Sequence, residues 1–558
     1  MNFYIYSFIG IILLLLAIVL YTTYCKKKSI KNLNETFGDF PKDFLEDFDM
    51  TFIKSYYETR KNNSPSSVSI DELTWNDLDM DTVFKRINYT RTSLGESYLY
   101  YKLRDIKYDK DQWNTIEKLA KAFTYNEKLR NEIAMLLQSV GKIHNLSFID
   151  FIYNPKFTKI KGYYKYPLLA LGFTLSLILS FFNTLALIPL FIFFCANILC
   201  YHSEKLFLED RFNVMIYVLN NIKLCKSLTK IKENDFDFFK NKIDSTLHDF
   251  KDLNKIRTYG SSFQNKNSSF TDFEIIFDYI KMLFMVDIIA YENSARILEK
   301  NKENLYKIYD LVATLDCALN LAYYRKSLDD YCIPEFAESD DIELNNLYHP
   351  LISNPVKNSI LIKNNIIFTG SNASGKSTFI KAIALNCILA QSLNTALCSK
   401  YKCKFSKVIT SMAIRDNIMV GDSYFIAEIK SLKRLLDSLN GEIRVLAFVD
   451  EILKGTNTLE RIASSASILK YAEKTKAKLL VATHDIELTT MLTSYDNYYF
   501  SETVTNNGVT FDYKLKEGPS KTRNALKLLK TLNFENDVVL QANEIYQNFL
   551  TNEKWQIL

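Results

Sequence analysis

The chain has 558 residues, of which 48% are hydrophobic and 24% are charged, and its formal net charge is +5. This length and apolar content can fill the cores of several domains, while the charge is too small to indicate nucleic-acid binding by itself. The nine cysteines include no Cys-x-x-Cys pair, so we interpret them as reduced residues of a cytosol-facing protein, not as zinc ligands or a disulfide framework.

The first segment, Phe3–Tyr24, carries no charge over about the length that spans a bilayer as a helix, with aromatic residues near its ends. Four lysines follow: Lys26, Lys27, Lys28 and Lys31. The positive-inside rule therefore predicts that the amino terminus lies outside and the rest in the cytoplasm. A cleaved signal peptide is the alternative, but its basic end would be on the wrong side and no A-x-A-like site follows. We predict a transmembrane anchor over residues 1–25 and a polar linker over 26–70.

A patterned region follows the linker. From Asp77 onward, apolar residues such as Val83, Ile87 and Leu94 recur every three to four positions, which predicts packed helices. We expect the first part of a helical core over residues 71–165.

Two uncharged runs come next, Tyr166–Phe182 and Leu185–Tyr201, separated by Asn183-Thr184. Each is near the short limit for a spanning helix. Basic residues flank the pair on both sides: Lys156, Lys159, Lys161 and Lys165 before it, and Lys205 and Arg211 after it. This charge pattern predicts a transmembrane hairpin over 166–201 with both ends in the cytoplasm. A buried helical hairpin of a soluble core is the alternative, which the absence of an amphipathic face disfavours.

Long helices with charged faces are expected over 202–330, as the second part of the helical core. Strand-and-turn material with three prolines occupies 331–355 and opens a nucleotide-binding domain over 331–518. A helical segment, 519–558, follows it.

The strongest motif is Ile366–Phe379, an apolar strand end followed by a loop and a helix-like run. The loop fits G-x-x-x-x-G-K-[ST] at every fixed position and is followed by Thr378; its residues are Gly370, Ser371, Asn372, Ala373, Ser374, Gly375, Lys376 and Ser377. The glycines let backbone N–H groups turn onto phosphate oxygens at a helix N-terminus. Lys376 supplies charge to the β- and γ-phosphates and the Ser377 hydroxyl binds Mg²⁺. The motif predicts ATP and Mg²⁺ as ligands.

Two further strands are expected to end in the same site. Arg444–Glu451 is an apolar strand that ends in two carboxylates, of which Asp450 would hold Mg²⁺ and Glu451 would polarise the attacking water. Lys478–Ala482 leads to His484, which can reach the γ-phosphate as a sensor. Together they predict Glu451, His484 and Lys376 as the catalytic residues.

Between these motifs, Gly421–Ile429 is a glycine–serine turn that enters a helix. Ser423 and the helix N-terminus could bind phosphate oxygens, although an ordinary helix cap explains this stretch equally well.

The motifs TGSNASGKSTF, GDSYFIAEI, FVDEILKGTNTLERIA and VATHDIEL, in this order and spacing, resemble the ATPase domain of the MutS family. Met80–Arg104 resembles the start of that family's helical core, and Tyr513–Ala542 its C-terminal dimerisation helices. The resemblance implies an α/β P-loop ATPase domain of the ABC type, preceded by an all-α, lever-like core. With the uncharged segments above, the expected fold also has three transmembrane helices.

The resemblance also implies roles for residues. His484 matches the switch histidine of the family, and Ser423 matches the serine that reaches the nucleotide of a partner subunit, so the chain is expected to be a homodimer. Gly455–Thr458 matches the signature turn, but Leu453 stands where the family usually has a glycine. The core starts near residue 71, so the mismatch-recognition domain of the family is expected to be absent.

Two hypotheses follow. The first is a multi-pass ATPase of the inner, cytoplasmic membrane, in contact with lipid, whose closure on ATP moves the helical core and acts on an unknown client protein. The second is a membrane-tethered protein that binds mismatched or branched DNA in repair or recombination, for which clustered basic residues would be needed. An ABC-type transporter is a third option, which three spans without substrate-path charges disfavour.

Overall fold

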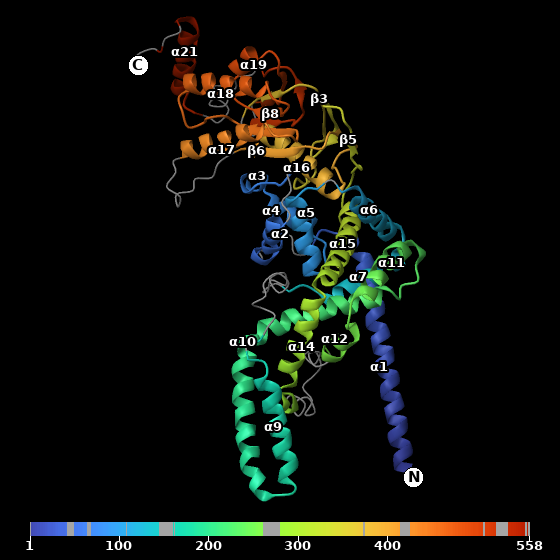
Figure 1. The fold of residues 1–558 in the computed structure, drawn as a ribbon. Helices are drawn as coiled ribbons and strands as arrows, with labels where there is room; N and C mark the ends of the chain where they lie inside the picture. Colours follow the sequence, from blue (N-terminus) through green and yellow to red (C-terminus); the bar gives the residue numbers. More distant parts are fainter. Residues whose placement is uncertain are drawn as a thin grey trace. The chain divides into compact units, whose positions relative to one another are not determined.

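The computed structural model describes residues 2–41, 50–63, 68–107, 109–143, 160, 162–260, 279–371, 374–412, 424–505, 508–520, 534–552 and 555. The chain divides into two compact units (Figure 1). The first comprises Met1–Pro65, Ile87–Tyr101 and Asp109–Ser327, and the second comprises Ser66–Arg86, Lys102–Tyr108 and Leu328–Leu558.

The described part of the first unit is helical. Its helices are α1 (Asn2–Glu35), α2 (Thr51–Asn63), α5 (Ser93–Arg104, which runs on into the second unit), α6 (Lys110–Tyr125), α7 (Glu127–Val140), α9 (Lys165–Ser180), α10 (Leu187–Leu228), α11 (Asp237–Asp249), α12 (Leu253–Gly260), α14 (Val286–Lys300) and α15 (Lys302–Lys326). At the centre is α15, which is buried all round from Val312 to Arg325 and packs against α6, α7, α10, α11 and α14. This burial pattern is that of a core helix, not of a surface helix.

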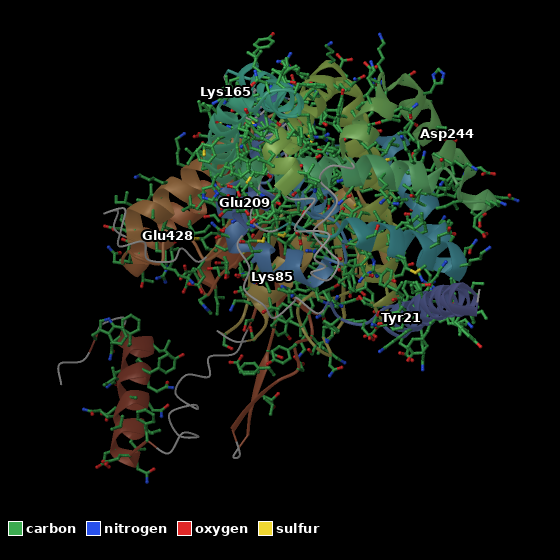
Figure 2. The ribbon with its side chains drawn as sticks, turned by 90° about the horizontal axis from the view of Figure 1, so that it is seen from below. Tyr21, Lys85, Lys165, Glu209, Asp244 and Glu428 are labelled. Atoms are coloured by element: carbon green, nitrogen blue, oxygen red, sulfur yellow. The ribbon has the colours of Figure 1, made fainter. Side chains whose placement is uncertain are left out.

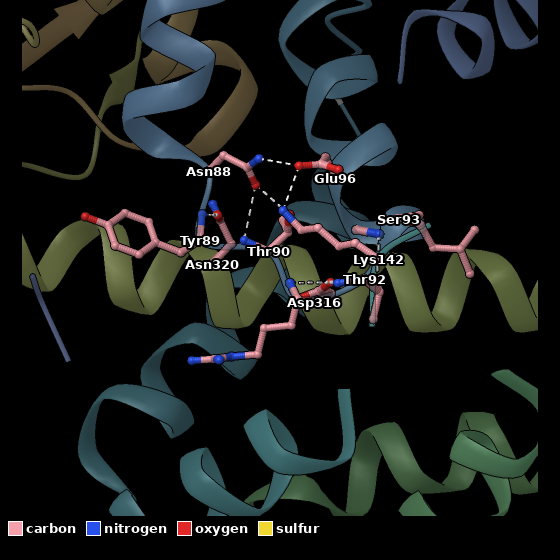
Figure 3. Close-up of polar contacts among 12 residues, drawn as sticks. Asn88, Tyr89, Thr90, Thr92, Ser93, Glu96, Lys142, Asp316 and Asn320 are labelled. Carbon is pink, nitrogen blue, oxygen red and sulfur yellow. Dashed lines mark hydrogen bonds and ion pairs between the residues drawn. The ribbon is translucent and has the colours of Figure 1, made fainter. Parts of the chain in front are cut away.

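A buried carboxylate on α15 fixes the loop that precedes α5 (Figure 3). Asp316 accepts hydrogen bonds from the backbone N–H groups of Arg91 (3.0 Å) and Thr92 (2.8 Å) and from the Thr92 hydroxyl (2.6 Å). One turn further along α15, the Asn320 side chain accepts the N–H of Tyr89. Burial raises the pKa of Asp316, and the three donors oppose that shift. The carboxylate therefore holds the loop by accepting both donors of the buried Thr92 and the N–H of the partly buried Arg91.

We expect Asp316→Ala to lower the free energy of unfolding by about 2–4 kcal/mol, because it leaves buried donors unsatisfied. Urea titration of the purified chain measures this. Asp244→Ala is the matched control, since Asp244 is an exposed carboxylate on α11 (Figure 2) and its loss should change stability by less than about 0.5 kcal/mol. Equal effects of the two substitutions would contradict the role given to Asp316.

Helices α9 and α10 lie side by side as a hairpin (Figure 1) whose turn begins at Asn183. Among the described helices, one segment, Thr184–Lys205, is long and apolar enough to be a candidate membrane span, and 11% of its most apolar window is buried. Lys165–Ser180 is apolar but shorter, and the predicted anchor lies within the long helix α1. Of the three predicted spans, one is thus a candidate among the described helices. Helix α9, with 16 residues, is too short, and α1 is not a candidate.

The second unit contains a six-stranded sheet in the order β12-β9-β4-β8-β7-β6. Its strands are β4 (Ile366–Thr369), β6 (Lys407–Ser411), β7 (Val445–Asp450), β8 (Lys478–Ala482), β9 (Asp496–Tyr499) and β12 (Lys516–Glu517). All neighbouring strands are parallel except the edge pair β12 and β9. Parallel strands buried on both faces explain the continuous apolar runs in the sequence.

Helices cover both faces of this sheet. On one face, Ile367, Ala447 and Val481 pack with residues of α17 (Tyr424–Ser438) and α18 (Thr458–Ala472). On the other, Phe368 meets Phe379 of α16 (Lys376–Leu393) edge to face. Consecutive residues of β4 thus point to opposite helical layers, which gives the doubly covered sheet of an α/β domain.

Smaller elements complete the second unit. A four-stranded sheet has the order β1-β5-β2-β3, with β1 (Glu335–Phe336), β2 (Ile342–Leu347), β3 (Asn358–Ile362) and β5 (Lys400–Cys403). A hairpin pairs β10 (Glu502–Thr505) with β11 (Gly508–Phe511). The helices α19 (Glu487–Met491) and α21 (Asn536–Asn552) follow β8 and β12 in the chain. The predicted dimerisation segment, 519–558, is described at 519–520, 534–552 and 555, and forms α21.

One expected boundary needs correction. Residues 71–165 were assigned to the helical core, but α3 (Glu72–Asp77) and α4 (Met80–Ile87, up to Arg86) group with the second unit. The reason is a set of contacts with β6, where Asp77 accepts the Thr410 hydroxyl (2.6 Å) and the Met412 N–H (3.0 Å). These partners are more than 330 residues away in sequence, so helical periodicity could not reveal them.

Candidate functional site

The loop between β4 and α16 has the backbone of a phosphate cradle. Gly370 has φ +137°, and a Cβ there would lie 2.5 Å from the carbonyl oxygen of Phe500. Gly375, with φ +106°, is the N-cap of α16. Only glycine adopts these positive φ angles without strain, and only glycine fits the close approach at position 370. Asn372 and Ala373 of the predicted loop lie outside the described residues.

Lys376 is folded back onto the loop. Its Nζ donates to the carbonyl oxygens of Gly370 (2.6 Å) and Ser371 (2.7 Å), and its side chain is buried. Burial lowers the pKa of Lys376 to about 8, although the charges of Asp450, Glu451 and Glu502 oppose that shift. A buried cation beside a helix N-terminus is well placed to exchange these carbonyls for phosphate oxygens. Ser377, half-buried, and Thr378, exposed, follow it on α16.

Asp450 is the last residue of β7 and Glu451 follows it, while His484 follows β8, the strand between β7 and β4. Glu451 and His484 meet at 2.8 Å (Oε1 to Nε2), and Lys454 contacts the other oxygen of Glu451 at 3.0 Å. Burial alone would raise the pKa of Glu451, but the hydrogen bonds from His484 and Lys454 lower it to about 2. The predicted base is therefore ionised, and both of its oxygens are engaged.

The turn after the base is strained where the sequence departs from the resembled family. Glu451 has φ +60° and Leu453 has φ +56°, the left-handed region that favours glycine. The Leu453 side chain is buried in the hydrophobic core on the α17–α18 face of the sheet, which offsets a strain on the order of 1 kcal/mol. The leucine thus keeps the conformation that a glycine would adopt. Gly455–Thr458 leads into α18, whose N-cap is Asn457.

The structure adds residues that the motifs did not reveal. The Ser371 hydroxyl donates to Glu502 of β10 at 2.6 Å, which brings a buried carboxylate onto the phosphate loop. Arg461 of α18 forms two hydrogen bonds with Asp485, next to His484. Glu428 of α17 accepts the N–H of Lys454. Arg461, Asp485 and Glu428 lie within the motifs quoted above but had no predicted role, and Glu502 lies outside those motifs.

A cavity of about 530 Å³ adjoins the phosphate loop. Lys376, Ser377 and Thr378 line part of it, and the remaining lining is mixed, with the aromatic Tyr348 and Tyr513 and the apolar Ile352 beside polar residues such as Asn354 and Asn358. Its size suits a nucleoside, and an aromatic wall beside a cationic loop can bind a base and its phosphates together. Ser423, by contrast, lies outside the described residues, although α17 begins directly after it.

A phosphate loop between strand β4 and helix α16, with a carboxylate pair at the end of the parallel strand β7 two positions away in the sheet, defines a P-loop nucleotide-binding domain of the ATPase type. Residues 366–550 match the family described as MutS domain V. This domain therefore belongs to the MutS domain V family, and its relatives are named MutS protein homolog 4 and MutS.

Relatives are similar to this chain over less than half of its length. The MutS protein homolog 4 of Homo sapiens is 32% identical over 261 residues, which cover 43% of this chain and 27% of that protein. The DNA mismatch repair protein MutS of Bacteroides fragilis (strain YCH46) is 30% identical over 263 residues, 44% of this chain and 30% of that protein. The DNA mismatch repair protein MutS of Thermotoga petrophila is 29% identical over 276 residues, which cover 47% of this chain and 34% of that protein. The chain thus matches about a third or less of each relative's length.

Proposed function

We propose that the chain binds and hydrolyses ATP as a homodimer and couples this to movement of its helical unit. The observation that carries the proposal is that one domain contains both groups that ATP hydrolysis needs. These are the buried Lys376 at the phosphate loop and the ionised Glu451, which contacts His484. The variants Lys376→Ala and Glu451→Gln test it.

In this proposal, each group has one task. Lys376 and the loop N–H groups bind the β- and γ-phosphates, while Tyr348 and Tyr513 flank the base. Glu451 accepts a proton from the attacking water once a contact with His484 or Lys454 is released, and His484 stays within reach of the γ-phosphate. Ser377 and Asp450 fit a Mg²⁺ ion by their oxygen donors, and the ion would neutralise phosphate charge when bound.

We also propose that the first unit is a membrane-embedded part of the protein. The support is a band of exposed apolar side chains on α9 and the first half of α10, among them Leu171, Leu175, Ile188 and Phe191. Exposed apolar surface of this extent is costly in water. On α1, Leu13, Leu16 and Leu20 are exposed as well. If these apolar segments lie in a membrane, the lysines that flank them would lie on its cytoplasmic side together with the ATPase domain.

The root of the hairpin is fixed to α14 and the residues before it. Asn197 of α10 donates to the Leu283 carbonyl at 2.7 Å, and the Tyr201 hydroxyl donates to Asp287 at 3.1 Å. Before α9, the N–H of Ile160 donates to the buried Glu292 at 3.0 Å. Since Asn301 alone separates α14 from the core helix α15, movement of α15 would reach the hairpin through these contacts.

Cysteine labelling tests the topology. In a chain whose native cysteines are replaced by serine, Asn183→Cys should react with a membrane-impermeant maleimide in intact cells, because the hairpin turn would face outside. Glu338→Cys, an exposed position of the second unit, is the control and should react only after permeabilisation. Labelling of position 338 in intact cells, or release of the chain by alkaline carbonate, would rule out the proposed arrangement.

DNA is the second candidate partner, because two of the relatives above are named as DNA mismatch repair proteins. Binding to mismatched or branched duplex that weakens steeply with salt would favour it, since phosphate contacts release counterions.

A further inference from the structure

Two cysteines of the second unit lie against each other outside the groups assigned above. The Sγ atoms of Cys332 and Cys398 are 3.6 Å apart. Cys332 is half-buried and Cys398 is buried. The chain segments are held in register, because Cys332 donates its N–H to the Ala396 carbonyl (2.9 Å) and accepts the Ala396 N–H (3.0 Å). These two backbone hydrogen bonds therefore hold the thiols of Cys332 and Cys398 next to each other.

We propose that Cys332 and Cys398 are an oxidisable dithiol, which a hydroperoxide converts into a disulfide that alters the wall of the nucleotide cavity. The Cys332 thiolate attacks one oxygen of hydrogen peroxide, the O–O bond breaks, and a sulfenic acid and hydroxide form; the hydroxide becomes the first water with the proton that the Cys332 thiol released. The Cys398 sulfur then attacks the Cys332 sulfur, the S–O bond breaks, and the second water leaves with the remaining proton. The two sulfurs lose two electrons together and the peroxide gains them.

The geometry permits this reaction. A disulfide bond is about 2.05 Å long, so the sulfurs must approach by roughly 1.5 Å. Cys332 lies in an isolated bridge and not in a regular strand, so its segment can shift without breaking a ladder. Cys332 is also the more exposed thiol, and the contact with Cys398 lowers the pKa of Cys332, which favours the attacking thiolate.

The disulfide would act on the cavity through Tyr348, which lines it. The Tyr348 hydroxyl donates to the Asp330 carbonyl at 2.6 Å, two residues before Cys332. The Tyr348 N–H donates to the carbonyl of Leu397 at 3.1 Å, next to Cys398. Both anchors of the ring thus lie on the two segments that the disulfide would draw together. Displacing them disturbs both hydrogen bonds and should weaken nucleotide binding.

The first test is the bond itself. The full-length chain in detergent is treated with hydrogen peroxide, and unreduced peptides are mapped by mass spectrometry. We expect a Cys332–Cys398 linkage in the wild type and none in Cys332→Ser. Cys387 and Cys403 provide an internal control, because they also contact each other but both are buried from the oxidant. Failure of the 332–398 linkage to form, or preferential linkage of 387 to 403, would overturn the proposal.

The second test measures the Kd of fluorescent mant-ATP. Oxidation should raise it at least about threefold in the wild type, a thiol reductant should reverse this, and Cys332→Ser should not respond. An unchanged Kd in a chain shown to carry the disulfide would refute the effect on the cavity. This effect rests on the proposed ATP site, whereas the linkage does not. If the reduced chain binds no mant-ATP, the proposed function fails while the mapped disulfide stands.

Discussion

Lys376→Ala is expected to abolish ATP binding, whereas Glu451→Gln is expected to preserve binding and lose hydrolysis. The first change removes a buried cation from the phosphate loop, and the second removes only the group that accepts the proton of water. The fall in kcat for Glu451→Gln should be on the order of 10²–10⁴-fold, which is the usual contribution of a general base. Fluorescence of mant-ATP measures binding, and phosphate release measures turnover.

Lys381→Ala is a matched control for the lysine. Lys381 lies further along α16, but its Nζ contacts Asp79 at 2.9 Å and not the loop, so ATP binding should change little. Equal loss of ATP affinity in Lys376→Ala and Glu451→Gln would show that the two residues do not have the separate roles assigned to them.

The second large effect concerns assembly. If Ser423 binds the nucleotide of a partner subunit, Ser423→Arg and Lys376→Ala should each be inactive alone and partly active when mixed. The mixed dimer has one intact site, formed by the phosphate loop of the first variant and Ser423 of the second. Phosphate release should recover towards half of the wild-type rate per mixed dimer.

A second mixture controls for this result. Lys376→Ala with Glu451→Gln should not recover, because both residues belong to the same half of the site and each composite site keeps one defect. If heterodimers form but neither mixture is active, the shared site is ruled out and Ser423 is an ordinary helix cap.

The sequence predicted the phosphate loop because its requirements are local. A strand end, two glycines at fixed spacing and a helix start are all contained in 14 consecutive residues, and the structure has β4, the loop and α16 in that order. The pairing of Glu451 with His484 was also within reach, since parallel strands of one sheet bring their carboxyl ends together.

Other parts of the site depend on tertiary contacts that no local pattern carries. Glu502 reaches Ser371 from 131 residues further along the chain. Tyr348 and Tyr513 lie outside helices and strands, and no motif in the sequence assigned either of them to the nucleotide cavity. The sequence around Lys454 predicts only a turn, although the Lys454 side chain contacts the proposed general base, Glu451. Such residues are fixed by packing, and packing cannot be derived from periodicity or spacing.

The hairpin shows a similar limit. Uniform hydropathy predicted two apolar segments, the second ending at Tyr201, but α10 continues as one helix to Leu228. The residues after Tyr201 contain neither proline nor glycine, so nothing ends the helix where its apolar character ends. A fall in hydropathy along the chain indicates where a segment becomes polar, but it does not indicate where a helix ends.

The continuity of α10 makes it a rigid rod. At 1.5 Å per residue, its 42 residues measure about 63 Å. It packs against α7, α11, α12, α14 and α15 of the helical unit and pairs with α9 in the hairpin. With its only proline in the first turn, the rod has no hinge at which a tilt could be absorbed. A tilt of about 5° at the packed end would move the far end by about 5 Å, close to the pitch of one helical turn. A tilt too small to break a hydrogen bond in the core would therefore displace the hairpin tip by about the pitch of one helical turn.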